Sequence, residues 1–101
     1  MAKLKLKYQA SVPLSEFLRS TRERVGLSQL DVATQLGYTS AQFISNWERG
    51  LSNPPPQAVK ILASVFHLNA DDFFEFYLEH SKQRLESQLR SEFYKHKKTR
   101  N

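Results

Sequence analysis

The spacing of apolar residues along the chain predicts five helices and very little strand. Between residues 14 and 25 apolar side chains recur every three or four positions, which is the period of an amphipathic helix. The same period predicts helices over about 29–36, 41–49 and 56–66. A fifth helix begins near residue 70, and because neither glycine nor proline follows it, we expect it to continue into the nineties. The pattern indicates an all-α fold.

Capping residues mark where several of these helices begin and end. Ser28 is placed as an N-cap, with Asp31 three residues later to complete a capping arrangement. Thr39 or Ser40 is expected to cap the third helix, and Asn69 the fifth. All three glycines of the chain stand directly after a predicted helix, where the chain reverses most easily.

Residues 3–8 depart from the helical pattern, because apolar residues and lysines alternate there with the period of a strand. The lysines are Lys3, Lys5 and Lys7. One short strand is not stable alone, so this segment either pairs with a strand of another subunit or forms a flexible basic arm. The chain is therefore divided into an arm or strand (1–12), a central domain (13–80) and a basic helical extension (81–101).

The positive charge lies at the two ends of the chain. The net charge is +5, made up of +3 over residues 1–7, −3 over residues 8–80 and +5 over residues 81–101. Basic ends suit a polyanion such as DNA, although they also simply keep a protein in solution.

Several classes of protein are disfavoured by composition. There is no cysteine, which removes disulfides and thiolate chemistry, and no apolar run reaches the ~20 residues of a membrane span. No signal peptide is recognised at the N-terminus, so a cytoplasmic location is expected. The histidines stand far apart and no phosphate-binding glycine loop is present, so we expect no enzyme activity, no cofactor and no metal site.

The third predicted helix has two unlike faces. Phe43, Ile44 and Trp47 fall on an apolar face, and Phe43 and Trp47, like Phe66 further on, are expected in the core. The other face is small and polar, with Gln42, Ser45 and Arg49 flanked by Ala41 and Asn46. A helix that enters the major groove needs such a face, although an ordinary amphipathic surface helix has one too.

Two segments carry a resemblance to a known family. Leu-Ser-Gln-Leu-Asp-Val-Ala at 27–33 and Ile-Ser-Asn-Trp-Glu-Arg-Gly at 44–50 resemble the repressor/Cro-type helix-turn-helix family, often called the XRE family. The resemblance covers roughly residues 14–75 and implies a compact five-helix bundle that binds operators in double-stranded DNA, usually as a dimer. The turn before the third helix is one residue longer here than in many members, and the third helix carries only one basic residue.

The resemblance assigns roles to individual residues. Ser40, Ala41, Gln42 and Asn46 match positions that face the bases, and Ser45 joins them on the same side of the helix. Gln29 matches a family position that contacts the DNA backbone. Backbone contacts are also expected from Tyr38, Thr39, Arg49 and Asn53 and, because of their charge, from the three N-terminal lysines. For Tyr38, covering the core is an equal alternative. Arg22 and Glu48 match a structural ion pair between the first and third helices.

The fifth helix is expected to form a homodimer through a thin apolar stripe. Its members are Phe74, Leu78, Leu85, Leu89 and Phe93. The alternatives are a helix that folds back on its own domain or frays after about residue 89. Four aromatic residues at 73, 74, 76 and 77 crowd one short stretch, so two or more of them are expected to face another subunit or the C-terminal segment.

These patterns together favour a dimeric transcriptional regulator, most simply a repressor, that reads a pseudo-palindromic operator. Two other functions remain open at this point. One is an antitoxin-like or anti-regulator module whose main partner is a protein, and the other is an assembly protein that oligomerises through the long helix.

Overall fold

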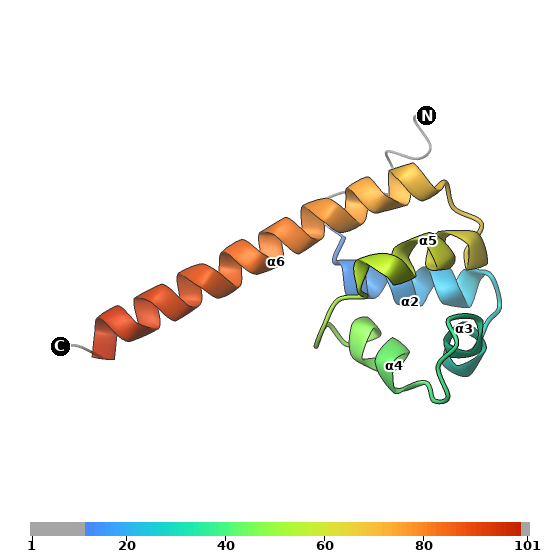
Figure 1. The fold of residues 1–101 in the computed structure, drawn as a ribbon, viewed down its shortest axis with the longest axis horizontal. Coiled ribbons are helices and arrows are strands. Elements are labelled where there is room, and N and C mark those ends of the chain that lie inside the picture. Colours follow the sequence, from blue (N-terminus) through green and yellow to red (C-terminus); the bar gives the residue numbers. More distant parts are fainter. Residues whose placement is uncertain (1–11, 100–101) are drawn as a thin grey trace.

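The computed structural model describes residues 12–99 of the chain, and their side chains as far as residue 95. These residues form five helices and no strand (Figure 1). The helices are α2 (Leu14–Arg24), α3 (Gln29–Gln35), α4 (Gln42–Glu48), α5 (Pro56–Val65) and α6 (Ala70–Thr99). The all-α fold is therefore confirmed, whereas the strand or arm predicted over residues 3–8, with its three lysines, lies outside the described residues.

Helices α2 to α5 and the start of α6 form a globular bundle, and the rest of α6 extends away from it as one straight helix (Figure 1). At 1.5 Å per residue, its 30 residues measure about 45 Å. The extension neither folds back on the domain nor ends near residue 89. Among the helices described, none is both long enough and apolar enough to cross a membrane.

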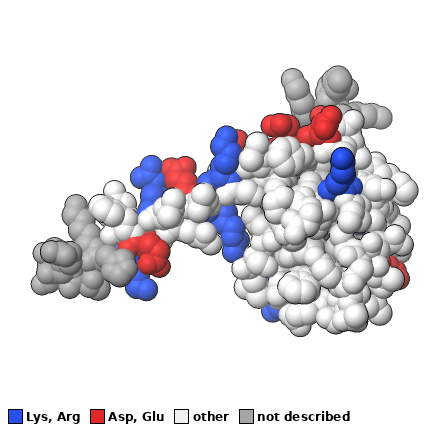
Figure 2. All heavy atoms as spheres, in the orientation of Figure 1, with Lys and Arg blue, Asp and Glu red and all other residues white. Residues whose placement is uncertain are grey.

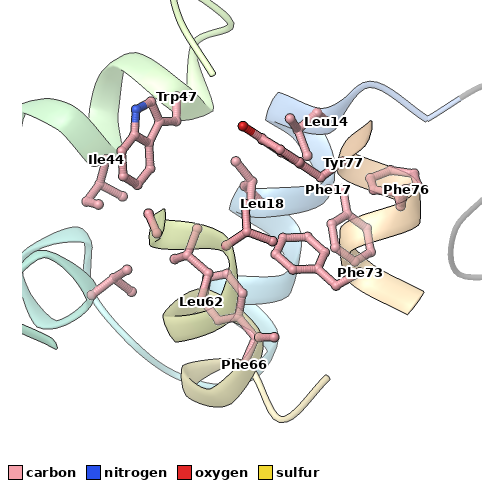
Figure 3. Packing of buried hydrophobic residues seen from close by; sticks show 14 of the residues in the cluster. Leu14, Phe17, Leu18, Ile44, Trp47, Leu62, Phe66, Phe73, Phe76 and Tyr77 are labelled. Atoms are coloured by element: carbon pink, nitrogen blue, oxygen red, sulfur yellow. The ribbon is translucent and has the colours of Figure 1, made fainter. Parts of the chain in front are cut away.

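The core lies where α2 and α5 meet the first two turns of α6, and α3 and α4 close it from the other side (Figure 3). Its largest side chains are the aromatic ones of Phe17, Trp47, Phe66, Phe73, Phe76 and Tyr77. Several of these rings pack against one another. The ring of Phe17 lies 5.9 Å from that of Phe73 and 4.9 Å from that of Phe76.

The expectation that two or more of the crowded aromatic residues face a partner is wrong. Phe73, Phe76 and Tyr77 are all buried in the domain itself, and only Phe74 is exposed, at 41%. The reason is their spacing: positions 73, 76 and 77 share one side of a helix, while position 74 points about 100° away. Tyr77 also satisfies its hydroxyl group in the core, by donating to the carbonyl oxygen of Pro54 at 2.9 Å.

Side-chain caps begin two of the helices as the sequence predicted. The Asp31 N–H donates to Ser28 Oγ at 2.9 Å, and the Ser28 N–H donates to Asp31 Oδ2 at 2.8 Å. The bond from the Ser28 N–H is the main reason that the pKa of Asp31 lies below its ordinary value of 3.8, and the Ser28 hydroxyl group lowers it further. At the start of α6, Asn69 Oδ1 accepts from the Asp72 N–H at 2.9 Å.

The predicted start of the third helix was wrong by one residue. Residues 39–41 form a bend, and Ala41, with ψ 4°, is the residue that precedes α4. Alanine offers no side-chain acceptor, so the cap expected from Thr39 or Ser40 is absent in that position. Ser40 Oγ instead makes a long contact of 3.4 Å with the Gln42 N–H.

Four helices end in the same way, with one residue in the left-handed region that lets the last carbonyl groups find donors. Gly26, Gly37 and Gly50 take that position after α2, α3 and α4, as the sequence predicted. After α5 the position is held by His67, with φ 58°. The N–H of Leu68 donates to Ala63 O at 2.8 Å, which completes the same motif without a glycine.

His67→Gly is expected to raise the free energy of unfolding by about 0.5–1 kcal/mol. The relief of left-handed strain, about 1–2 kcal/mol, is partly offset by the greater freedom of glycine in the unfolded chain. Denaturant titration of the two proteins measures the difference. The opposite change, Gly37→Ala at φ 82° in open space, is the control and should lower stability by about 1 kcal/mol. A less stable His67→Gly protein would contradict the account.

Candidate nucleic-acid interface

Helices α3 and α4 lie together on the side of the bundle away from the start of α6 (Figure 1). A turn over residues 36–41 joins them. Ile44 and Trp47 anchor α4 to the core (Figure 3). The opposite side of α4 faces solvent, so this short helix lies at the surface of the domain with one side accessible.

The exposed side of α4 carries a polar strip, formed by Gln42, Ser45, Asn46 and Arg49. Two donors converge on one oxygen of Asn46: Gln42 Nε2 at 3.0 Å and Arg49 Nη2 at 2.9 Å. Positions 42, 46 and 49 are one turn apart, so the bonds run along the helix. Three of the four side chains are thus aligned before any ligand arrives.

A buried carboxylate holds α4 in place from behind. Arg22 on α2 donates to both oxygens of Glu48, through Nε at 2.6 Å and Nη2 at 3.0 Å. Gln29, at the start of α3, donates to Glu48 Oε1 at 3.0 Å. Only 3% of the Glu48 side chain and 12% of the Arg22 side chain are exposed. The hydrogen bonds from Arg22 to Glu48 raise the pKa of the guanidinium above its ordinary value.

The guanidinium also reaches the turn between α2 and α3, where Arg22 Nη1 donates to Leu27 O at 2.8 Å. One ion pair therefore joins α2, the beginning of α3 and the end of α4. A bidentate arrangement of this kind fixes direction as well as distance.

This geometry is that of a helix-turn-helix motif, and a family model described as helix-turn-helix matches residues 18–73, more than half of the chain. The chain belongs to the repressor/Cro-type (XRE) helix-turn-helix family. It is a DNA-binding transcription regulator, and the family is not one of enzymes. No curated protein and no solved structure matches the chain. In family terms α3 and α4 are the two helices of the motif, and α4 is the recognition helix.

The structure brings some of the residues expected at the helix-turn-helix interface together and separates others. Thr39 and Ser40 are exposed in the turn, and Ala41 beside them is half-buried. Gln29, expected to contact the DNA backbone, lies at the start of α3, and its side-chain amide donates a hydrogen bond to Glu48. Asn53 lies apart from the polar strip, in a hollow that it lines with Pro13, Leu14, Ser15, Gly50, His80, Gln83 and Arg84.

The expectation that Phe43 belongs to the core is wrong. Its side chain is 53% exposed, and the nearby side chain of Leu51 is exposed as well. Trp47 and Phe66 are buried as predicted. The helical wheel explains the difference: Phe43 lies about 100° from Ile44, at the margin of the buried face, and Trp47 only about 60° from it. Tyr38 is half-buried and packs between Phe43 and Trp47.

Sequence reasoning missed the contacts that α6 makes with the recognition helix. Arg84 donates to Gly50 O at 3.2 Å and to Leu51 O at 2.9 Å, directly after the end of α4. A cation is favourable there because the carbonyl ends of a helix carry partial negative charge. His80 is half-buried, and its Nε2 lies 2.8 Å from the carbonyl oxygen of Val12. No local pattern announces such pairs, since their partners are more than 30 residues away.

Basic residues are sparse around the recognition helix. Arg49 is the one basic residue of the polar strip. Figure 2 shows few charged side chains on the visible face of the globular part, whereas acidic and basic side chains lie along α6. Electrostatic attraction from the central domain to the phosphates is accordingly expected to be weak.

Removing the carboxylate with Glu48→Ala is expected to lower the free energy of unfolding by about 3 kcal/mol. The loss exceeds the net value of the pair because Arg22 then remains largely buried, with only the exposed carboxylate of Glu23, 3.9 Å away, as a counter-charge. Chemical denaturation measures it, and the Arg22→Met, Glu48→Ala double variant should recover part of the loss.

The exposed pair Glu86–Arg90 is the matched control. Its separation of 2.9 Å is ordinary for an ion pair, yet both side chains are more than half exposed. Glu86→Ala should therefore change stability by no more than about 0.5 kcal/mol. Equal losses in the two variants would show that burial of the Arg22–Glu48 pair is irrelevant.

Proposed function

We propose that this regulator is a dimeric repressor that reads a pseudo-palindromic operator in double-stranded DNA. Each subunit places α4 in the major groove, with its polar strip against the bases. The observation that carries the proposal is the alignment of Gln42, Asn46 and Arg49 through two hydrogen bonds on the exposed side of the family's recognition helix.

The chemistry of the polar strip suits adenine. Asparagine and glutamine each present one acceptor and one donor, which match the N6 amino group and N7 of adenine in the major groove. On DNA, the N6 amino group takes the place of one of the donors that Asn46 Oδ1 accepts in the free protein. Because the side chains are already aligned, little rotamer freedom is lost on binding. Arg49, released from Asn46, then reaches a phosphate.

The second subunit is recruited by the apolar stripe of α6. Its distal members Leu85, Leu89 and Phe93 are all more than half exposed, on a helix that extends free of its own domain. Phe74 is exposed and Leu78 half-buried on the same side nearer the bundle. Pairing two such helices removes this surface from water and sets two recognition helices about one turn of DNA apart, roughly 34 Å.

Repression follows from occupancy alone, since a protein that fills both half-sites excludes another from the same DNA. The competing function is a module whose main partner is a protein, with DNA secondary. What favours it is the low positive charge beside α4, since phosphate neutralisation supplies most nonspecific DNA affinity.

Selection from a random DNA pool should enrich an inverted repeat with half-sites one helical turn apart. Asn46→Ala should then weaken binding to the enriched site by roughly 5- to 100-fold and relax preference at one base pair in each half-site. Fluorescence anisotropy over a salt series measures both. Gln88→Ala, which truncates an exposed amide on α6, is the control and should leave affinity unchanged. If the pool yields no enriched sequence, the protein-partner function takes precedence.

Leu89→Asp is expected to convert the dimer into monomers by placing a charge in the paired apolar stripe. Sedimentation at micromolar concentration measures the mass, and affinity for the full operator should fall to that for an isolated half-site. Ser87→Asp adds the same charge to the opposite side of the same helix and should leave the dimer intact. A wild-type protein that sediments as a monomer would refute pairing through α6.

A further inference from the structure

An exposed aromatic ring lies beside the polar strip and takes part in none of the DNA contacts proposed above. Phe43 lies in the first turn of α4, and 53% of its side chain faces solvent. By the helical wheel it is about 60° from Asn46, on the side of the polar strip away from Ser45. A ligand that covers Asn46 would therefore meet the phenyl ring as well.

The ring is fixed in place by its neighbours. Its centroid lies 4.9 Å from that of Tyr38, and the Tyr38 ring lies 6.1 Å from that of the buried Trp47. The three rings form an aromatic row that runs from the core to the surface next to Asn46. Tilted and edge-on packing at these distances is favourable for aromatic pairs. The outer ring, packed against Tyr38, thus presents an apolar surface beside the recognition residues.

In the major groove, the apolar group available to such a ring is the 5-methyl group of thymine, and phenylalanine is among the side chains that contact it. Thymine is also the partner of adenine, the base that suits Gln42 and Asn46. An amide on adenine and a phenyl ring on a neighbouring thymine methyl group together read an A·T-rich half-site from both strands.

We propose that Phe43 is a base-reading residue that packs against a thymine methyl group next to the adenine bound by Asn46 or Gln42. This inference rests on the proposed placement of α4 in the major groove. It adds a second kind of base recognition. An apolar contact with a methyl group would act beside the hydrogen bonds that Asn46 and Gln42 make with adenine.

The test replaces each thymine of the selected operator, one at a time, with deoxyuridine, which removes the methyl group and keeps the base pair. Wild-type protein should lose about three- to tenfold in affinity at one thymine of a half-site, the amount expected when one buried methyl group is removed. Phe43→Ala should bind the thymine operator more weakly and show no further loss on the deoxyuridine operator. Phe43→Leu, which keeps an apolar side chain, should retain part of the discrimination.

Leu51→Ala is the control, because it truncates another exposed apolar residue outside the polar strip and should keep the full wild-type discrimination. Two results overturn the inference: wild-type protein that binds every deoxyuridine operator as tightly as the thymine operator, or Phe43→Ala protein that loses as much on substitution as wild type. Either leaves the proposed function standing if Asn46→Ala still weakens operator binding. If no operator is enriched and Asn46→Ala has no effect, the proposed function itself fails.

Discussion

The rest of the structure depends on one buried carboxylate. Glu48 ends the recognition helix, and its charge is tolerable in the core only while Arg22 and Gln29 donate to it. Those donors come from α2 and from the start of α3, so the three helices are held in the one orientation in which all the bonds are made. Apolar packing of Ile44 and Trp47 gives α4 its affinity for the core, but packing alone is not directional. The ion pair supplies the direction, and the exposed polar strip faces outward as its consequence.

Helix α6 extends that control to the second subunit of the proposed dimer. Tyr77, His80 and Arg84 lie about one turn apart along α6, and they bond respectively to Pro54, Val12 and the residues just after α4. Each partner is a backbone carbonyl group, so the contacts depend on the path of the chain and not on a neighbouring side chain. The helix that completes the core with Phe73 thus leaves the domain at a fixed angle to the recognition helix. In a dimer paired through the far ends of the two α6 helices, that angle sets the distance between the two α4 helices.

Contacts between residues close together in the sequence could be predicted from it, and contacts between residues far apart could not. The bonds of Ser28 with Asp31, and of Asn69 with Asp72, span three residues, so the capping pattern located them correctly. Phe43 was misplaced because a helix of seven residues has a margin where the wheel cannot decide between core and solvent. Arg84 was missed because its partners are more than 30 residues away and are main-chain atoms, which carry no residue-type signal. The position of the helix-turn-helix motif was therefore predictable from the sequence, and which of its side chains face outward was less so.

The sparse charge around α4 also bears on the proposed pairing of two subunits through α6. With a single arginine on the polar strip, one domain of the proposed dimer is expected to neutralise few phosphates and to bind a half-site weakly. Hydrogen bonds and methyl contacts to base edges distinguish sequences without adding much nonspecific attraction. Joining two such domains makes the second binding event intramolecular, which multiplies affinity without any new contact. A weak half-site then becomes an advantage, because a lone matching sequence is released while a correctly spaced pair is retained. In the proposed dimer, the spacing set by α6 would therefore contribute to specificity as much as the residues of α4 do.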